Sequence, residues 1–212
     1  MFKTESQDAS KMSSLHAGTN QNGSTRFKPT VAAIVPAYNE ADTIGDILQV
    51  LLRCPDIDEL IVVNDGSSDD TADIAASLGV RVVNLYPNRG KGGAMKAGSQ
   101  VTSADILLFI DADLVGLTNA HCYALLEPVL NDKADMTIGI FSGGRPTTTL
   151  AQKITPSLSG QRALRKEIIE DIPELEDSRY GVEVAISRYA TSNCIRVEKV
   201  PLQDVSQIMK EE

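Results

Sequence analysis

Three short apolar runs, each followed at once by acidic or polar residues, constrain the fold of this chain more than any other feature. The runs and their turns are residues 31–35 with 36–40, 60–63 with 64–69, and 106–110 with 111–113. Apolar runs of this length are typical of strands that are buried in a sheet. Because ligands of open α/β sheets bind outside the carboxyl ends of the strands, the three turns are expected to form one site.

The rest of the first half alternates between strand and helix patterns. Apolar residues recur with helical spacing over 44–52 and 74–78, and a further strand is predicted over 80–84. A glycine-rich turn at 88–93 opens a helix that reaches about residue 101. Short strand–helix units in series predict an α/β fold with a parallel sheet and right-handed crossovers.

The second half of the chain is less regular. Its patterns predict helices near 122–130, 164–170 and 181–189, strands near 136–140 and 195–200, and a Gly-, Thr- and Pro-rich loop over 141–156. Residues 1–28 are polar and show no periodicity, so a disordered tail is expected there. A single domain is expected over 29–212.

The composition excludes several classes of function. A net charge of −9 without a basic stripe argues against a nucleic-acid-binding protein. There is no apolar run of membrane-spanning length and no signal peptide, so any membrane contact is expected to be peripheral. Cys54, Cys122 and Cys194 lie far apart along the chain without zinc-site spacing, which is typical of reduced thiols in a cytoplasmic protein.

Asp111, Asp113 and Asp65 are the first candidates for chemistry. Two carboxylates one residue apart on a turn suit a hard divalent cation that also holds phosphate oxygens. The structural alternative for Asp111 and Asp113 is a turn that caps the next helix. The carboxylate of Asp65 can accept a hydrogen bond from a base imide or a ribose hydroxyl, and its structural alternative is a helix N-cap.

Three further charged residues have both a binding and a structural interpretation. Lys91 lies in the glycine-rich turn before a predicted helix, a place that suits phosphate, although taken alone the turn favours a solvated loop lysine. Arg145 follows Gly144 and can clamp a phosphate or carboxylate, or lie on an ordinary surface loop. Glu183 near a helix start is favoured by the helix dipole, and it can also act as a general base or orient an acceptor.

Taken together and in order, the three turns resemble the motifs of GT-A glycosyltransferases of family two. The segments that carry the resemblance are Pro36-Ala37-Tyr38-Asn39-Glu40 after Val35, Asn64-Asp65-Gly66-Ser67-Ser68-Asp69, and Asp111-Ala112-Asp113. The resemblance covers about residue 30 to the C-terminus. It implies a Rossmann-like GT-A fold, with a mixed, mostly parallel sheet flanked by helices. It also implies sugar transfer from a nucleotide-sugar with the help of Mg²⁺ or Mn²⁺.

Carried over position by position, the family motifs imply a role for each matching residue. The nucleotide-sugar pocket would be lined by Pro36, Ala37, Tyr38, Glu40 and Ala112. Asp65 would hold the base, and Lys91 would lie beside the nucleotide or diphosphate. Asp111 would face ribose or the water of a metal held by Asp113, so both carboxylates are predicted metal ligands and Asp113 is also a predicted catalytic residue.

The second half is similar to glucosyl-3-phosphoglycerate synthases. In those enzymes a Gly-Arg-x-Thr loop grips the phosphorylated acceptor, and the matching residues here are Gly144, Arg145 and Thr147. Tyr180-Gly181-Val182-Glu183 resembles the segment with their acceptor-side glutamate, which makes Glu183 the second predicted catalytic residue. Ser159-Gly160-Gln161-Arg162 resembles the Ser-Gly segment of polyprenyl-phosphate sugar transferases, which use a lipid acceptor.

The chain departs from the family pattern in two places. The relatives often supply a histidine as a further metal ligand near the C-terminal strand, and Gln207 stands where that histidine is expected. An amide oxygen is a weaker ligand than imidazole but suits a hard cation, so Gln207 is a candidate third ligand. The chain has no tryptophan, so the QxxRW motif of processive synthases is absent and one sugar per encounter is expected.

The predicted function is therefore a cytoplasmic, metal-dependent hexosyltransferase that moves one sugar from a UDP- or GDP-linked donor. Its predicted acceptor is a small phosphorylated molecule or a polyprenyl phosphate. A catalytically weak nucleotide-sugar-binding module is one alternative, which Gln207 leaves open. A nucleotidyltransferase is another, although residues 36–40 replace the Gly-rich, Arg-containing loop that such enzymes use. A homodimer is a further expectation, since many such proteins pair through C-terminal elements.

Overall fold

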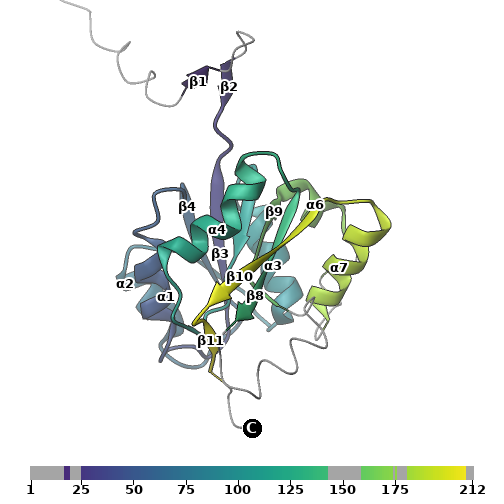
Figure 1. Ribbon diagram of the computed structural model, residues 1–212. Helices are drawn as coiled ribbons and strands as arrows, with labels where there is room; N and C mark the ends of the chain where they lie inside the picture. The colour runs from purple at the N-terminus through teal and green to yellow at the C-terminus, as the bar shows by residue number, and fades with distance from the viewer. Residues whose placement is uncertain (1–16, 20–24, 143–158, 174, 176–180, 209–212) are drawn as a thin grey trace, which may run out of the picture.

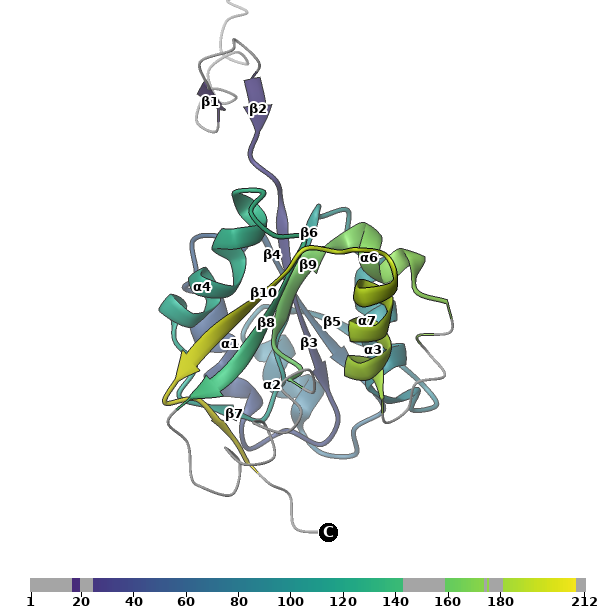
Figure 2. The same ribbon diagram turned by 45° about the vertical axis from the view of Figure 1, so that its right-hand side comes forward.

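A seven-stranded sheet forms the centre of this protein. The computed structural model describes residues 17–19, 25–142, 159–173, 175 and 181–208. The strands of the sheet are β3 (Val31–Ala37), β4 (Glu59–Asn64), β5 (Arg81–Asn84), β6 (Ile106–Phe109), β8 (Met136–Ser142), β9 (Arg162–Arg165) and β10 (Val197–Gln203). Their order is β10-β8-β9-β6-β3-β4-β5, and helices lie on both sides of the sheet (Figures 1 and 2).

The sheet is mostly parallel, with one reversed strand. β6, β3, β4 and β5 run parallel to one another, and β10 runs parallel to β8. Strand β9 pairs antiparallel with both of its neighbours, β6 and β8. These pairings confirm the predicted Rossmann-like GT-A architecture with a mixed, mostly parallel sheet.

Strand β9 corrects one predicted element. The helix predicted over 164–170 begins instead at Lys166 as α6 (Lys166–Asp171), and Leu164 lies in the strand before it. Leu164 is fully buried and pairs with Leu107 of β6 and with Met136 of β8. A strand of four residues gives too short a pattern to separate it from a helix by periodicity, so its type is decided by these distant partners.

Within the described residues, three helices cover each face of the sheet. The helices of one face are α1 (Ile44–Leu51), α2 (Thr71–Ser77) and α4 (Asn119–Leu130), and those of the other are α3 (Gly90–Gln100), α6 and α7 (Val182–Ser192). Helix α1 buries Ile44, Ile47, Leu48 and Leu51, which share one face at helical spacing. Burying each such side chain contributes roughly 1.5–3 kcal/mol, so the apolar stripe fixes this helix on the sheet.

Helix α4 begins three residues earlier than the sequence pattern predicts. Thr118 is its N-cap: the Thr118 hydroxyl accepts from the His121 backbone N–H, and the His121 ring accepts from the Thr118 backbone N–H. This reciprocal cap satisfies two backbone donors that the helix itself leaves without partners.

The remaining described elements are small. β7 (Leu114–Val115) pairs antiparallel with β11 (Ser206–Gln207). β1 (Ala17–Thr19) and β2 (Thr25–Phe27) form an antiparallel hairpin within the predicted tail, and it stands apart from the sheet in Figure 1. Residues 1–16 and 20–24 of that tail, and the predicted acceptor residues Gly144, Arg145 and Thr147, lie outside the described residues. Among the described residues, no helix has the length and apolarity needed to cross a bilayer.

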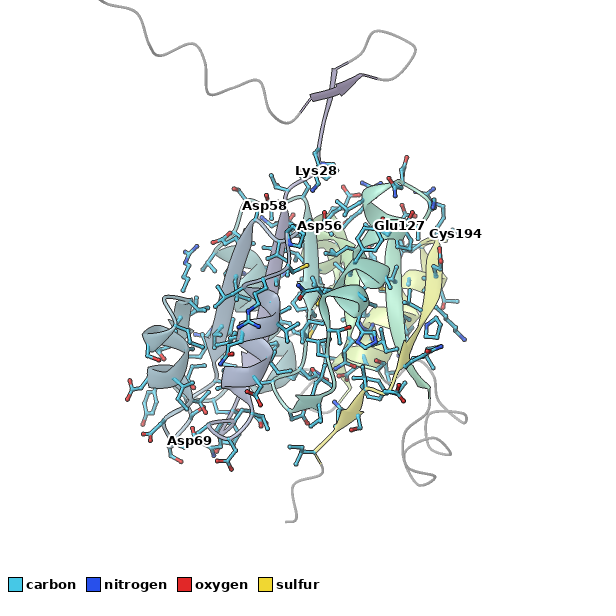
Figure 3. All side chains as sticks on the ribbon, turned by 60° about the vertical axis from the view of Figure 1, so that its left-hand side comes forward. Lys28, Asp56, Asp58, Asp69, Glu127 and Cys194 are labelled. Carbon is cyan, nitrogen blue, oxygen red and sulfur yellow. The ribbon has the colours of Figure 1, made fainter. Side chains whose placement is uncertain are left out.

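Charged residues anchor the chain at both ends of the parallel strands. Lys28 and Asp56 form an ion pair of 3.1 Å, and the Asp58 carboxylate accepts from the Val31 backbone N–H, where β3 begins. Figure 3 shows these three side chains near one end of the molecule and Asp69 at the opposite end. The end that carries Asp69 is the carboxyl edge of β3 and β4.

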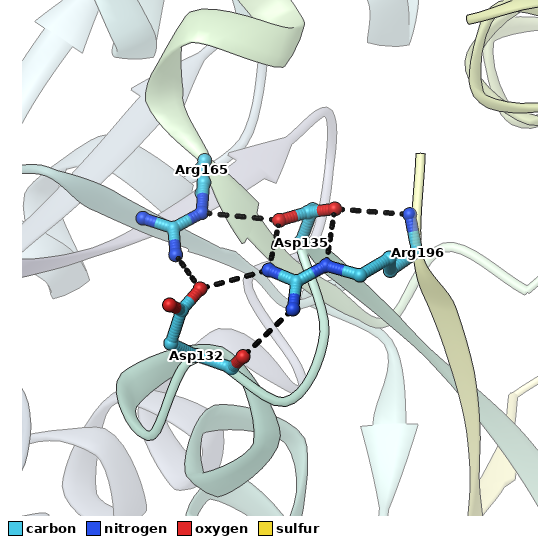
Figure 4. A network of polar contacts seen from close by, with 4 residues as sticks. All are labelled: Asp132, Asp135, Arg165 and Arg196. Atoms are coloured by element: carbon cyan, nitrogen blue, oxygen red, sulfur yellow. Dashed lines mark hydrogen bonds and ion pairs between the residues drawn. The ribbon is translucent and has the colours of Figure 1, made fainter. Parts of the chain in front are cut away.

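A second charged network ties β8, β9 and β10 together where β8 and β10 begin and β9 ends (Figure 4). The Arg196 guanidinium donates to both carboxylate oxygens of Asp135, at 2.7 and 3.0 Å, and to the Asp132 carboxylate at 2.8 Å. Arg165 donates to the same two aspartates. The side-chain hydrogen bond from Arg196 lowers the pKa of Asp135 to about 2. Forked arginine–carboxylate pairs of this kind fix orientation as well as distance.

Replacing Arg196 with methionine is expected to weaken the folded protein in a pH-dependent way. An unfolded aspartate has a pKa of about 3.9, so the lowered pKa of Asp135 stabilises the fold above about pH 4. That contribution is lost as the pH falls through about 2. Because Arg196 is half-exposed, solvent screens its ion pairs, and the loss at pH 7 should be small but measurable. Urea unfolding at pH 7 and at pH 2.5 measures it. The difference from wild type should shrink at the lower pH, and Arg188→Met, at an exposed arginine of α7, serves as the control.

Candidate functional site

The carboxyl ends of β3, β4 and β6 open into one pocket of about 220 Å³. Its lining residues are Pro36, Ala37, Tyr38, Glu40, Asp65, Lys91, Ala94, Asp111, Ala112, Asp113 and Gln207. This set contains every residue that the sequence predicts for the donor and for the metal, together with Ala94 of helix α3. The structure therefore brings these residues to a single place.

The turns after β3 and β4 are bound to each other by side chains. The Asn39 backbone N–H donates to the Ser67 hydroxyl at 2.9 Å, and the Ala41 backbone N–H donates to the Asp69 carboxylate at 3.0 Å. Glu40 donates its backbone N–H to Thr71 at the start of α2. Asn39 adopts a left-handed conformation, with a φ of 54°, which asparagine tolerates better than most residues. The polar residues of both turns thus fix the pocket wall.

Asp65 lies at the buried end of the pocket and is only 4% exposed. Its carboxylate accepts from the backbone N–H of Arg89 at 2.7 Å, and its backbone carbonyl accepts from the Asn88 side chain. Burial raises the pKa of Asp65, and hydrogen bonds from the N–H groups of Arg89 and Gly90 oppose that shift. The predicted N-cap role does not apply, because the N-cap of α2 is Asp70. Asp65 instead joins its own turn to the loop before α3.

Lys91 forms ion pairs with two carboxylates at once. Its ammonium lies 2.6 Å from Asp111 and 2.7 Å from Glu183. Although burial lowers it, the charges of Asp111 and Glu183 raise the pKa of Lys91 above its ordinary value. The interpretation of Lys91 as a solvated loop residue is therefore wrong. Glu183, in the first turn of α7, is brought against the pocket by the same lysine.

The two carboxylates of the Asp-Ala-Asp turn have different surroundings. Asp111 also accepts hydrogen bonds on Oδ2 from the side-chain amides of Gln161, at 2.8 Å, and Gln207, at 2.9 Å. The Gln207 amide lies 3.5 Å from Asp113. Gln207 reaches this place because β11 pairs with β7 directly after Asp113, and the backbone of Ile208 donates to the Asp113 carbonyl.

Asp113 carries the least compensated charge of the site. Burial raises the pKa of Asp113 to about 6, and the charges of Asp111 and Glu40 act in the same direction. No group of three or more His, Cys, Asp or Glu side chains within the described ranges is close enough to hold a metal ion. A pair of carboxylates nonetheless suits Mg²⁺ or Mn²⁺, which is commonly held by one or two carboxylates together with substrate phosphates. The donor set at Asp111 and Asp113 therefore fits such a cation.

Three site residues were not assigned a role from the sequence. Ser159 donates its hydroxyl to the Gln161 amide oxygen at 2.8 Å, and Arg162 donates from its guanidinium to the Ser159 carbonyl at 2.6 Å. Gln161 and Arg162 are fully buried. Burial lowers the pKa of Arg162 to about 10, although Glu183 and Asp111 favour its charged form. The Ser-Gly-Gln-Arg segment was the available signal, but it indicated only an acceptor type.

The family model for Glycosyl transferase family 2 matches residues 32–188. The chain belongs to glycosyl transferase family 2. The matched region contains the three motif turns, Lys91 and Glu183, and it leaves Gln207 outside. Family membership thus agrees with the fold and with the location of the pocket at the carboxyl ends of the strands.

Similar proteins include glucosyl-3-phosphoglycerate synthases. That of Mycobacterium tuberculosis is 30% identical over 194 residues, which cover 74% of this chain and 59% of the relative. The crystal structure of the M. tuberculosis enzyme with phosphoglyceric acid matches with a TM-score of 0.74 and 28% identity, over 86% of this chain and 73% of that one. Its complex with Mn²⁺, UDP-glucose and phosphoglyceric acid matches with a TM-score of 0.73 and 27% identity, over the same shares. The chain spans about three fifths of the length of the curated relatives.

Replacing Asp113 with asparagine is expected to stabilise the metal-free protein at neutral pH. Between about pH 4 and pH 6 the folded wild type holds a proton on Asp113 that the unfolded chain lacks, so its stability falls as the pH rises through that window. Above about pH 6 the asparagine variant should be more stable by on the order of 2 kcal/mol.

Thermal unfolding with a chelator at pH 5.0 and pH 7.5 tests this expectation. The gain of Asp113→Asn should be larger at pH 7.5 than at pH 5.0, and added Mn²⁺ should stabilise the wild type more than the variant. A variant that is less stable than the wild type at pH 7.5 would show that the Asp113 carboxylate is not under electrostatic strain.

Proposed function

We propose that this chain is a metal-dependent glycosyltransferase that transfers a single sugar from a UDP-linked donor to a small phosphorylated acceptor. The observation that carries the proposal is the pocket in which Asp65, Lys91, Asp111 and Asp113 lie together at the carboxyl edge of the parallel strands. Such an edge is where open α/β sheets bind nucleotides. The M. tuberculosis relative, solved with Mn²⁺ and UDP-glucose, supports the choice of metal and base.

The donor half of the pocket suits a nucleotide diphosphate. The Asp65 carboxylate accepts from the Arg89 backbone and, with about four lone-pair sites on its two oxygens, can also accept from the imide N–H of a base. Tyr38 lines the pocket with half of its surface exposed, so its ring offers an apolar face to the nucleoside. Lys91, in the first turn of α3, provides a positive charge for phosphate.

The residues of the chain divide the chemistry between donor and acceptor. Asp113 and Asp111 would hold Mg²⁺ or Mn²⁺, which stabilises the negative charge of a departing diphosphate. Glu183 would accept the proton of the attacking acceptor hydroxyl as the bond to the sugar forms. The Lys91 ammonium contacts both Asp111 and Glu183, so the donor and acceptor groups are a few ångströms apart. This proximity favours direct transfer, since oriented reactants need little further reorganisation.

The acceptor is proposed to be a phosphorylated acid similar to phosphoglyceric acid. The relative's complex with that molecule and the Gly144-Arg145-Pro146-Thr147 match in the sequence support this choice. An arginine can bind phosphate through two parallel hydrogen bonds. The buried charge of Arg162 near Glu183 adds positive potential on the same side. A polyprenyl phosphate shares the phosphate chemistry and is the competing acceptor.

A catalytically weak nucleotide-sugar-binding module is the second candidate. The observation that favours it is Gln207, whose amide nitrogen, and not its oxygen, faces Asp111 and Asp113. An amide nitrogen cannot bind a cation, so metal binding through Gln207 needs this amide to rotate. The free-energy cost of that rotation would lower the affinity of the site for the metal.

Replacing Asp113 with alanine is expected to abolish metal-dependent turnover. The direct assay is transfer of labelled glucose from UDP-glucose to 3-phosphoglyceric acid with Mn²⁺, followed by mass spectrometry of the product. Asp73→Ala, at an exposed aspartate on α2, is the matched control and should retain full activity. Turnover by Asp113→Ala at the wild-type rate would remove the proposed role of that carboxylate.

Thermal stabilisation of the wild type by UDP-glucose and GDP-mannose, with and without Mn²⁺, separates the two candidates. A donor at 100 times its dissociation constant should add about 2.7 kcal/mol. Stabilisation with turnover supports the transferase. Stabilisation without turnover on phosphoglyceric acid or polyprenyl phosphate would favour the binding module, and an equal effect of GDP-mannose would contradict the preference for uracil.

A further inference from the structure

The carboxylate of Asp111 is enclosed by donors from three elements of the structure. Lys91 contacts Oδ1, while Gln161 and Gln207 both donate to Oδ2. Asp111 is only 8% exposed, so these donors decide the direction in which its oxygens point. Two of the three, Lys91 and Gln207, line the pocket and can change partners when a ligand enters.

Gln161 differs from those two because it is fully buried and oriented by its own neighbour. Its amide oxygen accepts from the Ser159 hydroxyl at 2.8 Å, so its amide nitrogen faces Asp111. The backbone that carries Ser159 is fixed in turn, since the buried Arg162 guanidinium donates to the Ser159 carbonyl. A carboxylate only accepts hydrogen bonds, so the nitrogen is the end of the amide that Asp111 requires.

Gly160 lets this segment approach the ion pair closely. A Cβ atom at this position would overlap the Asp111 carboxylate and the Lys91 ammonium. The backbone of residues 159–161 therefore lies directly against the pair. Within residues 159–162, Gln161 holds Asp111, Ser159 orients Gln161, and Arg162 fixes the backbone of Ser159.

We propose that Gln161 is the positioning residue that keeps the Asp111 carboxylate directed at the pocket when a divalent cation binds. Gln207 cannot do this while it serves as a ligand, because turning its amide oxygen to the cation moves the nitrogen away from Asp111. Gln161 is then the remaining amide on Oδ2. The inference rests on the proposed metal-dependent function. It assigns to the segment 159–162 a role in ordering the metal site, in addition to its part in the sheet.

The test compares Mn²⁺ affinity in variants of the full chain, measured by electron paramagnetic resonance with and without UDP. Gln161→Met keeps the length of the side chain and removes the donor, so Mn²⁺ should bind about 10–100-fold more weakly, as when other groups that orient metal ligands are removed. Ser159→Ala keeps the Gln161 amide but removes the hydroxyl that orients it, so it should give a smaller loss of Mn²⁺ affinity. Wild-type affinity in Gln161→Met would overturn the proposal.

Thr137→Val is the matched control for damage to the fold. Thr137 is also fully buried, and its hydroxyl accepts from the Ala163 backbone of β9 and donates to Leu125 of α4. It lies in β8, next to the strand that follows Gln161, and its hydroxyl binds Leu125 and Ala163 instead of Asp111, so its loss should lower thermal stability and leave Mn²⁺ affinity unchanged. An equal loss of affinity in Thr137→Val would mean that Gln161 acts only through the fold.

Crystal structures of the wild type and of Gln161→Met, both with Mn²⁺ bound, provide a measurement that does not depend on catalysis. The proposal requires the Asp111 side chain to leave its wild-type rotamer in the variant, and an unchanged rotamer would overturn it. A wild type that binds Mn²⁺ but transfers no sugar would contradict the proposed function alone. If Gln161→Met does not fold, the Mn²⁺ affinity and structure of Ser159→Ala decide in the same way.

Discussion

The ion pairs of Lys91 with Asp111 and Glu183 are the interaction on which the site depends. They join the first turn of α3, the end of β6 and the first turn of α7, three segments that are distant in the sequence. Away from water, a charge without a partner costs several kcal/mol, so removing the ammonium would leave Asp111 and Glu183 without the cation that they share. The position of α7 beside the pocket is thus coupled to Asp111, which follows β6.

The pocket nevertheless retains an excess of negative charge. Glu40, Asp65, Asp111 and Asp113 line it, and Glu183 lies beside it through its ion pair with Lys91. The cations near these carboxylates are Lys91 and the buried Arg162. Lys91 is already engaged by Asp111 and Glu183. Burial raises the pKa of Asp113, and the charges of Asp111 and Glu40 raise it further. The unfavourable electrostatic energy at Asp113 would be relieved by a bound divalent cation with its diphosphate. Relief of that energy would add to the free energy of binding. Stability of the empty protein and affinity for the donor are therefore opposed at Asp113.

Features that depend on local pattern could be predicted from the sequence. Strands β3, β4 and β6 are apolar runs that end in polar turns, and parallel strands deliver those turns to one edge. Helix α1 could be predicted because the apolar residues that it buries against the sheet recur at helical spacing. That Asp65, Asp111 and Asp113 lie in one pocket could be predicted because they follow parallel strands of one sheet and because the motifs resemble those of the family.

Features that depend on distant partners could not be predicted. The glycine-rich turn alone favoured a solvated Lys91, because the carboxylates that bury it come from β6 and α7. Cys54 and Cys122 lie far apart in the sequence, yet their buried side chains share a hydrogen bond that lowers the pKa of Cys54. Neither contact leaves a signal within a window of a few residues, since each forms only when the sheet and its helices assemble.

The reversed direction of β9 explains why the segment before it reaches Asp111. A parallel strand brings the residues that follow it to the carboxyl edge of the sheet, whereas an antiparallel strand brings the residues that precede it. Arg162 pairs with Phe109, so residues 159–161 enter the sheet beside the residues that leave β6. Because a helix was predicted from Leu164 onward, the sequence did not indicate that residues 159–161 lie beside the end of β6. One reversed strand among parallel ones thus brings the segment that begins at Ser159 and the Asp-Ala-Asp turn together, and it gives Asp111 its buried donor, Gln161.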